Sequence, residues 1–448
     1  MKKNVIKIWE AVLLAIIVVV NSGCSLKRNY GTEYNFETDC QYSYYDSRDD
    51  WKRVQSDGTG QYILKNQYIY YYNTETKHLT PLCNKPNCLH DNEIDLNKLS
   101  DCNAYAPDTL SADERIQYYE GYIYYVDNNV NQTCLYRVKK DGSKKDKVFT
   151  TDDNIIISNW LIHRGCFYYS FAAFYYGEEQ STQIYKKCFL KSLELSSNMS
   201  EKNAKVIYES DEEHTIHGLY NLKAYQNYLC YEIVSNQNDY KVTNAESWLR
   251  QVYSPMYLYN IETGENCEVS IPKYCSETTI MKDVVFLKDK MLLILYDNLQ
   301  DSEFPLPIYS VNYDLTDMEI WLNNLEQGKN VQSYDNYVIL SDGPLHYSTF
   351  VSDDGIYSSV EKDPENPCIN VEIYSPDAER LSWFIYPMNQ NEGNFTGFGP
   401  DGVNVEFEEN DDSWSVYELN FDDVLNCQGE EIALNLVSTR KYGVLNRE

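Results

Sequence analysis

Glycine and proline are scarce in this sequence, with 19 and 13 among 448 residues. Such low contents exclude collagen-like and low-complexity structure. Basic residues are also few, because 38 Lys and Arg stand against 69 Asp and Glu and leave a formal net charge of −31. A nucleic-acid-binding surface needs concentrated Lys and Arg to displace counterions. We therefore expect no nucleic-acid partner and, with 43% hydrophobic residues, a globular body.

Several short catalytic motifs are missing too. The sequence has no G-x-S-x-G nucleophile elbow, no H-E-x-x-H zinc-protease helix and no Walker A phosphate-binding loop. We therefore name no catalytic residues. A pair of carboxylates like that of glycosidases stays open, because 69 acidic residues make some close pair near the centre of a fold almost inevitable.

A long hydrophobic run is also absent, since the longest, Ala11–Val20, has ten residues. About 20 apolar residues are needed to cross a bilayer. A ten-residue apolar run that follows a basic start (Lys2, Lys3 and Lys7) is typical of an export signal peptide.

The apolar run ends in Asn21-Ser22-Gly23-Cys24-Ser25, which resembles a bacterial lipobox. In a lipobox, signal peptidase cuts before the cysteine, which carries the lipid. The resemblance implies a signal peptide over residues 1–23, a palmitate-bearing Cys24 and a tether over residues 24–45. It also implies a location at the cell membrane, facing outside the cytoplasm. Asn21 departs from the usual leucine-like residue, so an ordinary signal peptide cut elsewhere, or an uncleaved anchor, stays open.

A turn residue followed by an apolar, aromatic-rich strand recurs along the chain. The seven copies begin at Gly60, Gly121, Gly165, Asn227, Lys290, Gly355 and Gly402, with a mean spacing of 57 residues. Each is followed by a second pattern of strand, polar turn and strand, as in Leu135–Ser143 with its Asp-Gly turn. Each unit is therefore predicted to form four antiparallel strands, which we call A to D.

The predicted B strands are apolar on both faces. In the second unit, one face carries Tyr122, Tyr124 and Val126, and the other carries Ile123 and Tyr125. A strand buried on both faces needs cover on both sides, which four-stranded blades stacked around an axis provide. We therefore predict an all-β fold, a β-propeller over residues 46–448 with seven four-stranded antiparallel blades; six or eight blades stay open.

The Tyr-Ile-Tyr-Tyr strand and the Leu-Tyr-Arg-x-x-x-Asp-Gly-Ser hairpin together resemble the TolB-type propeller of exported bacterial lipoproteins, including the domain of unknown function numbered 5050. The resemblance covers about residues 50–440. It implies a fold and an extracytoplasmic place more than an activity.

A cluster of metal-ligating residue types lies in an expected insert at residues 83–111. Cys83, Cys88, His90 and Cys102 follow the spacing C-x4-C-x-H-x11-C. Three thiolates and an imidazole complete the tetrahedral set of a structural zinc ion and leave no open position for catalysis. A disulfide is the alternative in an exported protein. A third interpretation is that these residues form neither a zinc site nor a disulfide.

Other cysteines sit inside the apolar strands, namely Cys134, Cys166, Cys188 and Cys230. We expect them to act as small core residues.

The connections between B and C strands are predicted to be long and variable, and in a propeller they emerge on the same face as the D–A connections. The residue 83–111 insert, a D–A connection, is therefore expected on that face too. Loops on a rigid scaffold often carry binding. The candidate ligand-binding residues are the aromatic residues expected in the loops 171–183 and 234–255, which are Phe174, Tyr175, Tyr176, Trp248 and Tyr253. Local packing of these aromatics is the alternative.

These observations favour a cell-surface, lipid-anchored β-propeller that acts as a non-catalytic binding or scaffold protein, with a glycan or a peptide as its ligand. The alternative is an extracytoplasmic glycan-cleaving hydrolase or lyase with its site at the propeller centre. Two close acids or a Tyr–His pair at the centre would favour the enzyme.

Overall fold

The computed structural model describes residues 30–41, 54–107, 115–129, 131–176, 184–196, 199–210, 215–236, 252–253, 255–272, 275, 279–297, 306–325, 329–334, 336–341, 345–352, 355–362, 368–387, 393–399, 402–410, 413–419, 421–431 and 435–441. The chain divides into two compact units, Met1–Glu33 and Tyr34–Glu448, and the described strands all lie in the second. Within these described ranges, no helix is long and apolar enough to cross a lipid bilayer.

Each of the first three blades is a sheet of four consecutive antiparallel strands. Blade 1 contains β1 (Val54–Ser56), β2 (Gly60–Lys65), β3 (Tyr68–Asn73) and β4 (His78–Pro81). Blade 2 contains β5 (Ile116–Tyr119), β6 (Tyr122–Asn128), β7 (Thr133–Lys139) and β8 (Lys145–Thr150). Blade 3 contains β9 (Ile157–His163), β10 (Cys166–Tyr176), β11 (Ile184–Glu194) and β12 (Lys205–Glu209).

The next four blades repeat this order with additions. Blade 4 contains β13 (Thr215–Tyr225), β14 (Tyr228–Asn236), β16 (Met256–Asn260) and β17 (Asn266–Val269), and the short β15 (Val252–Tyr253) pairs with β14. Blade 5 contains β18 (Thr279–Phe286), β19 (Lys290–Asp297), β20 (Leu306–Asn312) and β21 (Glu319–Leu325). Blade 6 contains β22 (Asn330–Tyr334), β23 (Tyr337–Ser341), β26 (Cys368–Tyr374) and β27 (Arg380–Pro387), with β31 (Gln428–Glu431) parallel to β27. Blade 7 contains β28 (Gly393–Gly399), β29 (Gly402–Asn410), β30 (Ser413–Leu419) and β32 (Asn435–Lys441).

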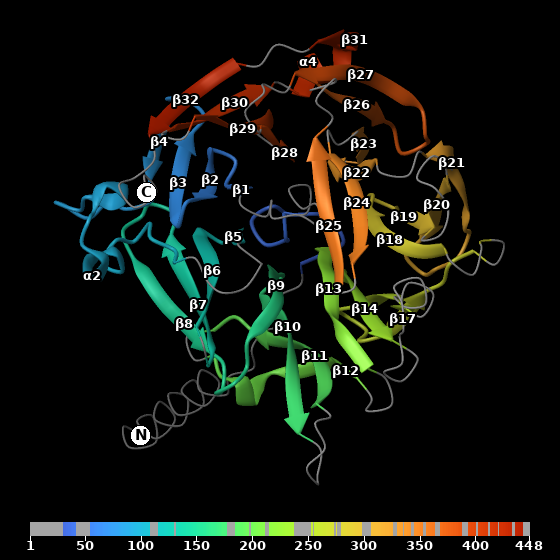
Figure 1. Cartoon of the computed structure of the whole chain (residues 1–448), viewed down its shortest axis with the longest axis horizontal. Coiled ribbons are helices and arrows are strands. Elements are labelled where there is room, and N and C mark those ends of the chain that lie inside the picture. Colours follow the sequence, from blue (N-terminus) through green and yellow to red (C-terminus); the bar gives the residue numbers. More distant parts are fainter. Residues whose placement is uncertain are drawn as a thin grey trace, which may run out of the picture. The chain divides into compact units, whose positions relative to one another are not determined.

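The seven sheets follow one another around a ring, so the fold is a seven-bladed β-propeller and the prediction is confirmed (Figure 1). The first strand of a blade, such as β5, β9 or β18, lies innermost, and the fourth, such as β8 or β21, lies at the rim. Helix among the described residues is limited to short elements, which are η2 (His90–Asn92), α2 (Leu96–Leu99), η3 (Glu201–Asn203) and α4 (Phe421–Asn426).

The apolar residues of the second strand of a blade explain its burial between neighbouring blades, as β6 shows. In β6, the neighbours Ile123 and Tyr124 point to opposite faces and are 0% and 4% exposed, because neighbouring blades cover both faces. The turn before this strand has φ +43° at Glu120 and +78° at Gly121. Two successive left-handed residues form the tight hairpin turn whose twist matches that of the flanking strands.

The inner strands are joined to one another by polar side chains. The Gln117 amide on β5 accepts from the backbone N–H of Ile162 on β9 (2.7 Å) and donates to the carbonyl of the same residue. Similar bonds run from the side chain of one inner strand to the backbone of a neighbouring inner strand at Asn159 and Leu219, Lys223 and Val284, and Ser333 and Phe286. Because a buried polar group must be hydrogen-bonded, these bonds satisfy the side chains and connect the blades.

One predicted blade strand was wrong. Gly355 begins β25 (Gly355–Lys362), which pairs only with β24 (Leu345–Ser352) in a separate two-stranded sheet. The second strand of blade 6 is instead β23, which lies before this hairpin. In the sequence, both strands follow polar, turn-type residues and carry apolar residues, so their local patterns are alike, and only the pairing partner distinguishes them.

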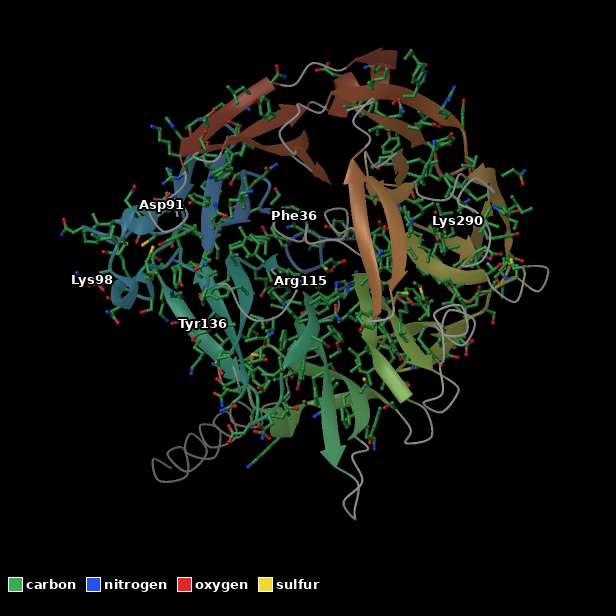
Figure 2. The ribbon with its side chains drawn as sticks, viewed as in Figure 1. Phe36, Asp91, Lys98, Arg115, Tyr136 and Lys290 are labelled. Atoms are coloured by element: carbon green, nitrogen blue, oxygen red, sulfur yellow. The ribbon has the colours of Figure 1, made fainter. Side chains whose placement is uncertain are left out.

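The compact unit begins earlier than the expected boundary at residue 46. Residues 34–41, which we call the N-terminal segment, belong to it. The backbone N–H of Cys40 donates to His163 Nδ1 (3.0 Å), and the Gln41 amide bonds with the backbone of Ser56 on β1. Figure 2 shows Phe36 near the middle of the ring. This part of the expected tether therefore packs against turns of the first blades, because its polar backbone finds partners there.

Candidate metal centre

The predicted cysteine and histidine ligands come together in the insert between β4 and β5. One ligand atom from each of Cys83, Cys88, His90 and Cys102 lies within 4.8 Å of the others. Cys102 Sγ is 3.6 Å from His90 Nδ1, and the three cysteines are free thiols. Zinc–sulfur bonds of about 2.3 Å give a tetrahedron with edges of about 3.8 Å. The set therefore fits a metal ion after a contraction of about 1 Å.

The pKa shifts of the candidate ligands differ in their effect on metal binding, because those of Cys83 and His90 favour the metal-binding forms and that of Cys102 opposes thiolate formation. Burial raises the pKa of Cys83, but the backbone N–H groups of Lys85 and Asn103 outweigh it, so the pKa lies below its usual value. Burial, followed by the nearby Cys83, raises the pKa of Cys102. Burial also lowers the pKa of His90, which keeps the imidazole neutral and able to bind a metal. A cation would hold both thiolates, and a metal-binding thiol loses its proton.

Residues of blade 2 form hydrogen bonds with the insert. The ammonium of Lys145 on β8 donates to the carbonyl oxygens of Cys102 (2.8 Å) and Tyr105 (3.1 Å). The Asn103 amide donates to the carbonyl of Gly142 (2.8 Å), whose φ is +70°. A Cβ atom on Gly142 would lie 2.7 Å from the Cys83 nitrogen, so only glycine fits this approach.

The insert contacts turns on both faces of the ring. On the expected face, the backbone N–H of Ala106 donates to the carbonyl of Gln67 (2.8 Å) in the β2–β3 turn, a B–C connection. Gly142, in contrast, lies in the turn between β7 and β8, a C–D turn. Figure 1 shows α2 of the insert outside the ring, beside the outer strands of blades 1 and 2. Twist accumulates across a four-stranded sheet, so the outer strands no longer run along the ring axis. A connection from an outer strand can therefore cross the rim.

The candidate ligand-binding aromatics are not brought into one described site. Phe174, Tyr175 and Tyr176 lie in β10, paired with β11, and not in a loop as expected. Tyr253 lies in β15, paired with Ser235. The side chains of these four residues, and the whole of Trp248, lie outside the described residues, as does Cys24. Their role in binding stays a prediction.

Three described ionisable side chains of the inner strands, His163, Lys223 and Asp283, are engaged within the protein. His163 is fully buried, its Nδ1 accepts from Cys40, and its Nε2 donates to the carbonyl of Gln226 (2.6 Å). Burial lowers the pKa of His163 to about 4, so it is neutral at pH 7. The Lys223 ammonium donates to both carboxylate oxygens of Asp283, at 2.6 and 2.8 Å.

A glycine-rich match to G-x-G-x-x-G runs from Gly397 to Gly402. In a dinucleotide-binding fold this motif joins a strand to a helix. Here Gly399 pairs with Gly402 across the antiparallel strands β28 and β29. The match is therefore part of a hairpin.

The strand cysteines behave largely as expected. Cys134, Cys188 and Cys230 are 3%, 1% and 1% exposed, and Cys166 is half-buried. Burial raises the pKa of Cys230 to about 12, so it remains a thiol at neutral pH. Such a residue packs as a small hydrophobe and does not ligate metal.

The sequence matches no family model and no curated protein. Solved structures resemble it in fold. Oligogalacturonate lyase from Vibrio parahaemolyticus is 12% identical with a TM-score of 0.44, over 84% of this chain and 88% of that chain. Hsv2 from Kluyveromyces lactis is 9% identical with a TM-score of 0.45, over 87% and 98%. Dipeptidyl peptidase 4 from Porphyromonas gingivalis is 10% identical with a TM-score of 0.44, over 90% and 61%.

Proposed function

We propose that the protein is a lipid-anchored β-propeller outside the cytoplasm that binds a glycan or a peptide without catalysis. The observation that carries this proposal is the use of ionisable groups on the inner strands. Lys223 and Asp283 neutralise each other, and both ring nitrogens of His163 are hydrogen-bonded to backbone groups. Groups engaged in this way connect blades, and they are not poised for acid–base chemistry.

The residue 83–111 insert is proposed to bind one structural zinc ion. Four ligands within 4.8 Å complete a tetrahedral set, so no position is left for a water molecule or a substrate. The experiment is elemental analysis of protein purified under reducing conditions, together with peptide mass mapping. We expect about one zinc per chain. If the analysis finds no metal and the mapping finds a peptide in which a disulfide links Cys83 and Cys88, the zinc proposal is wrong and the site is a disulfide.

Binding is tested with the chain from Ser25 to Glu448, which keeps the N-terminal segment. We expect it to bind members of a glycan or peptide array, and the Trp248→Ala and Tyr253→Ala variant to lose that binding with an almost unchanged melting temperature. Tyr34→Ala is the control, because Tyr34 is a 41% exposed aromatic of the N-terminal segment. Shortened glycans or new unsaturated sugar ends in the same samples would support the hydrolase or lyase instead.

The anchor is tested separately. The variant Cys24→Ala should leave the membrane fraction or accumulate as an uncut precursor, since lipid transfer needs the thiol. Normal processing and membrane retention of Cys24→Ala would contradict the lipid anchor.

A further inference from the structure

Among the described strands, the ring of blades closes without strand exchange between its two ends. Blade 1 consists of β1 to β4, and blade 7 consists of β28, β29, β30 and β32. Within the part of the chain that the structure describes, no backbone ladder joins the last blade to the first. Closure therefore depends on side chains there.

Arg440 of β32 reaches across this joint. Its Nε and Nη2 donate to the two carboxylate oxygens of Asp91, at 2.9 and 3.0 Å. Its guanidinium also lies 5.0 Å from the ring centroid of Tyr70, whose hydroxyl donates to Asp91 (3.1 Å). Trp414 of β30 packs edge-on against Tyr70. The Asp91 side chain is only 4% exposed, so it needs this charged partner.

Asp91 belongs to the insert and not to a blade. It follows the metal-ligating residue His90 in the single turn of η2, and Figure 2 shows it towards the rim of the ring. His90 has φ +53°, a left-handed conformation that is unfavourable for a non-glycine residue. The hydroxyl of Tyr68 holds the His90 carbonyl (3.2 Å). A metal bond to the His90 imidazole would fix the same turn from its other side.

We propose that the metal centre is the clasp that closes the propeller ring. The ion bound by Cys83, Cys88, His90 and Cys102 fixes η2, and η2 holds Asp91 in place for Arg440. The metal thus links the last blade to the first through one residue. This inference rests on the proposed zinc site.

The test measures amide hydrogen exchange in the whole protein, purified in detergent, before and after zinc is removed with a chelator. We expect exchange in β32 and η2 to become at least tenfold faster, while β18 and β19 stay unchanged. In the zinc-loaded protein, Arg440→Met should speed exchange in β32 by a similar factor. In Cys88→Ser, which loses the metal, Arg440→Met should add little, because the contact is already lost.

The matched control is Arg164→Met, because Arg164 makes the same two-bond contact with Asp39, away from the metal. The increase in amide hydrogen exchange that Arg164→Met causes should be equally large with and without zinc. Protection of β32 that survives zinc removal would overturn the clasp while the zinc site stands, and so would independent effects of Arg440→Met and Cys88→Ser. Absence of zinc from the wild-type protein would overturn both proposals. If Cys88→Ser does not fold, chelator titration of the wild type and of Arg440→Met gives the same comparison.

Discussion

The N-terminal segment and the residue 83–111 insert both lie outside the blades, and each is held by an Arg–Asp contact with two hydrogen bonds. Arg164 Nε and Nη2 donate to Asp39 at 2.9 and 3.0 Å, and Arg440 donates to Asp91 at the same two distances. Burial differs between them. The Arg164 and Asp39 side chains are 1% and 0% exposed, whereas the Arg440 side chain is 24% exposed.

The two aspartates differ in what else positions them. Beside Asp39, the Thr38 carbonyl accepts from the Arg164 N–H (2.8 Å), and the Cys40 N–H donates to His163. The blades themselves therefore fix the N-terminal segment. Asp91 lies in one strained turn at the rim, next to the proposed metal ligand His90. The N-terminal segment is thus held by contacts with the blades, whereas the insert is proposed to gain part of its order from a metal ion.

The largest effect is expected at the N-terminal segment. Arg164→Met leaves the Asp39 carboxylate buried without its partner, which lowers the free energy of unfolding by about 3–5 kcal/mol. Urea unfolding measures the loss, and zinc content should not change. Arg380→Met is the control, because Arg380 is 53% exposed and 3.8 Å from Glu372, and it should cost about 1 kcal/mol or less. Equal losses in both variants would contradict the importance of burial here.

Acid should weaken the N-terminal segment through His163. The pKa of His163 is lowered by burial to about 4 in the folded protein, against 6.5 when unfolded. The stabilisation is complete above pH 6.5 and is lost as the pH falls towards 4, because only the unfolded chain takes up the proton. The loss is about 3 kcal/mol. Urea unfolding at pH 6.5 and at pH 4 measures this effect. Between these pH values, the free energy of unfolding of His163→Gln, whose amide can also accept and donate, should change by about 3 kcal/mol less than that of the wild type.

Zinc should stabilise the insert and leave the N-terminal segment unaffected. At a free zinc concentration about 100 times the Kd, binding to the folded state alone adds about 2.7 kcal/mol. Cys88→Ser should lose this zinc-dependent gain in thermal unfolding, and Arg164→Met should keep it. A zinc response that persists in Cys88→Ser would place the metal elsewhere.

The smallest effect is expected from a cysteine of the blades. Cys230→Ala removes a 1% exposed thiol from the core and should lower the free energy of unfolding by about 1 kcal/mol. Zinc stoichiometry, measured by elemental analysis, should stay unchanged. A loss of metal in this variant would contradict the division between core cysteines and ligand cysteines.

Sequence patterns predicted the repeated hairpins well because their signals are local. The continuous apolar run Tyr122–Val126 and the Asp-Gly turn at Gly142 reflect burial and backbone preferences of neighbouring residues. The pattern failed at Gly355, where a similar strand pairs outside the blade. It also missed residues 34–41, whose partners lie far along the chain and leave no periodic trace.

The sequence by itself determined the ligand types of the metal centre and their order, because Cys83, Cys88, His90 and Cys102 lie within twenty residues. Only the tertiary structure decided what the insert touches. Arg440 and Asp91 are 349 residues apart, and nothing in either neighbourhood indicates the other. The ring brings the insert and the last blade together, and the burial of Asp91 then makes its pairing with Arg440 necessary.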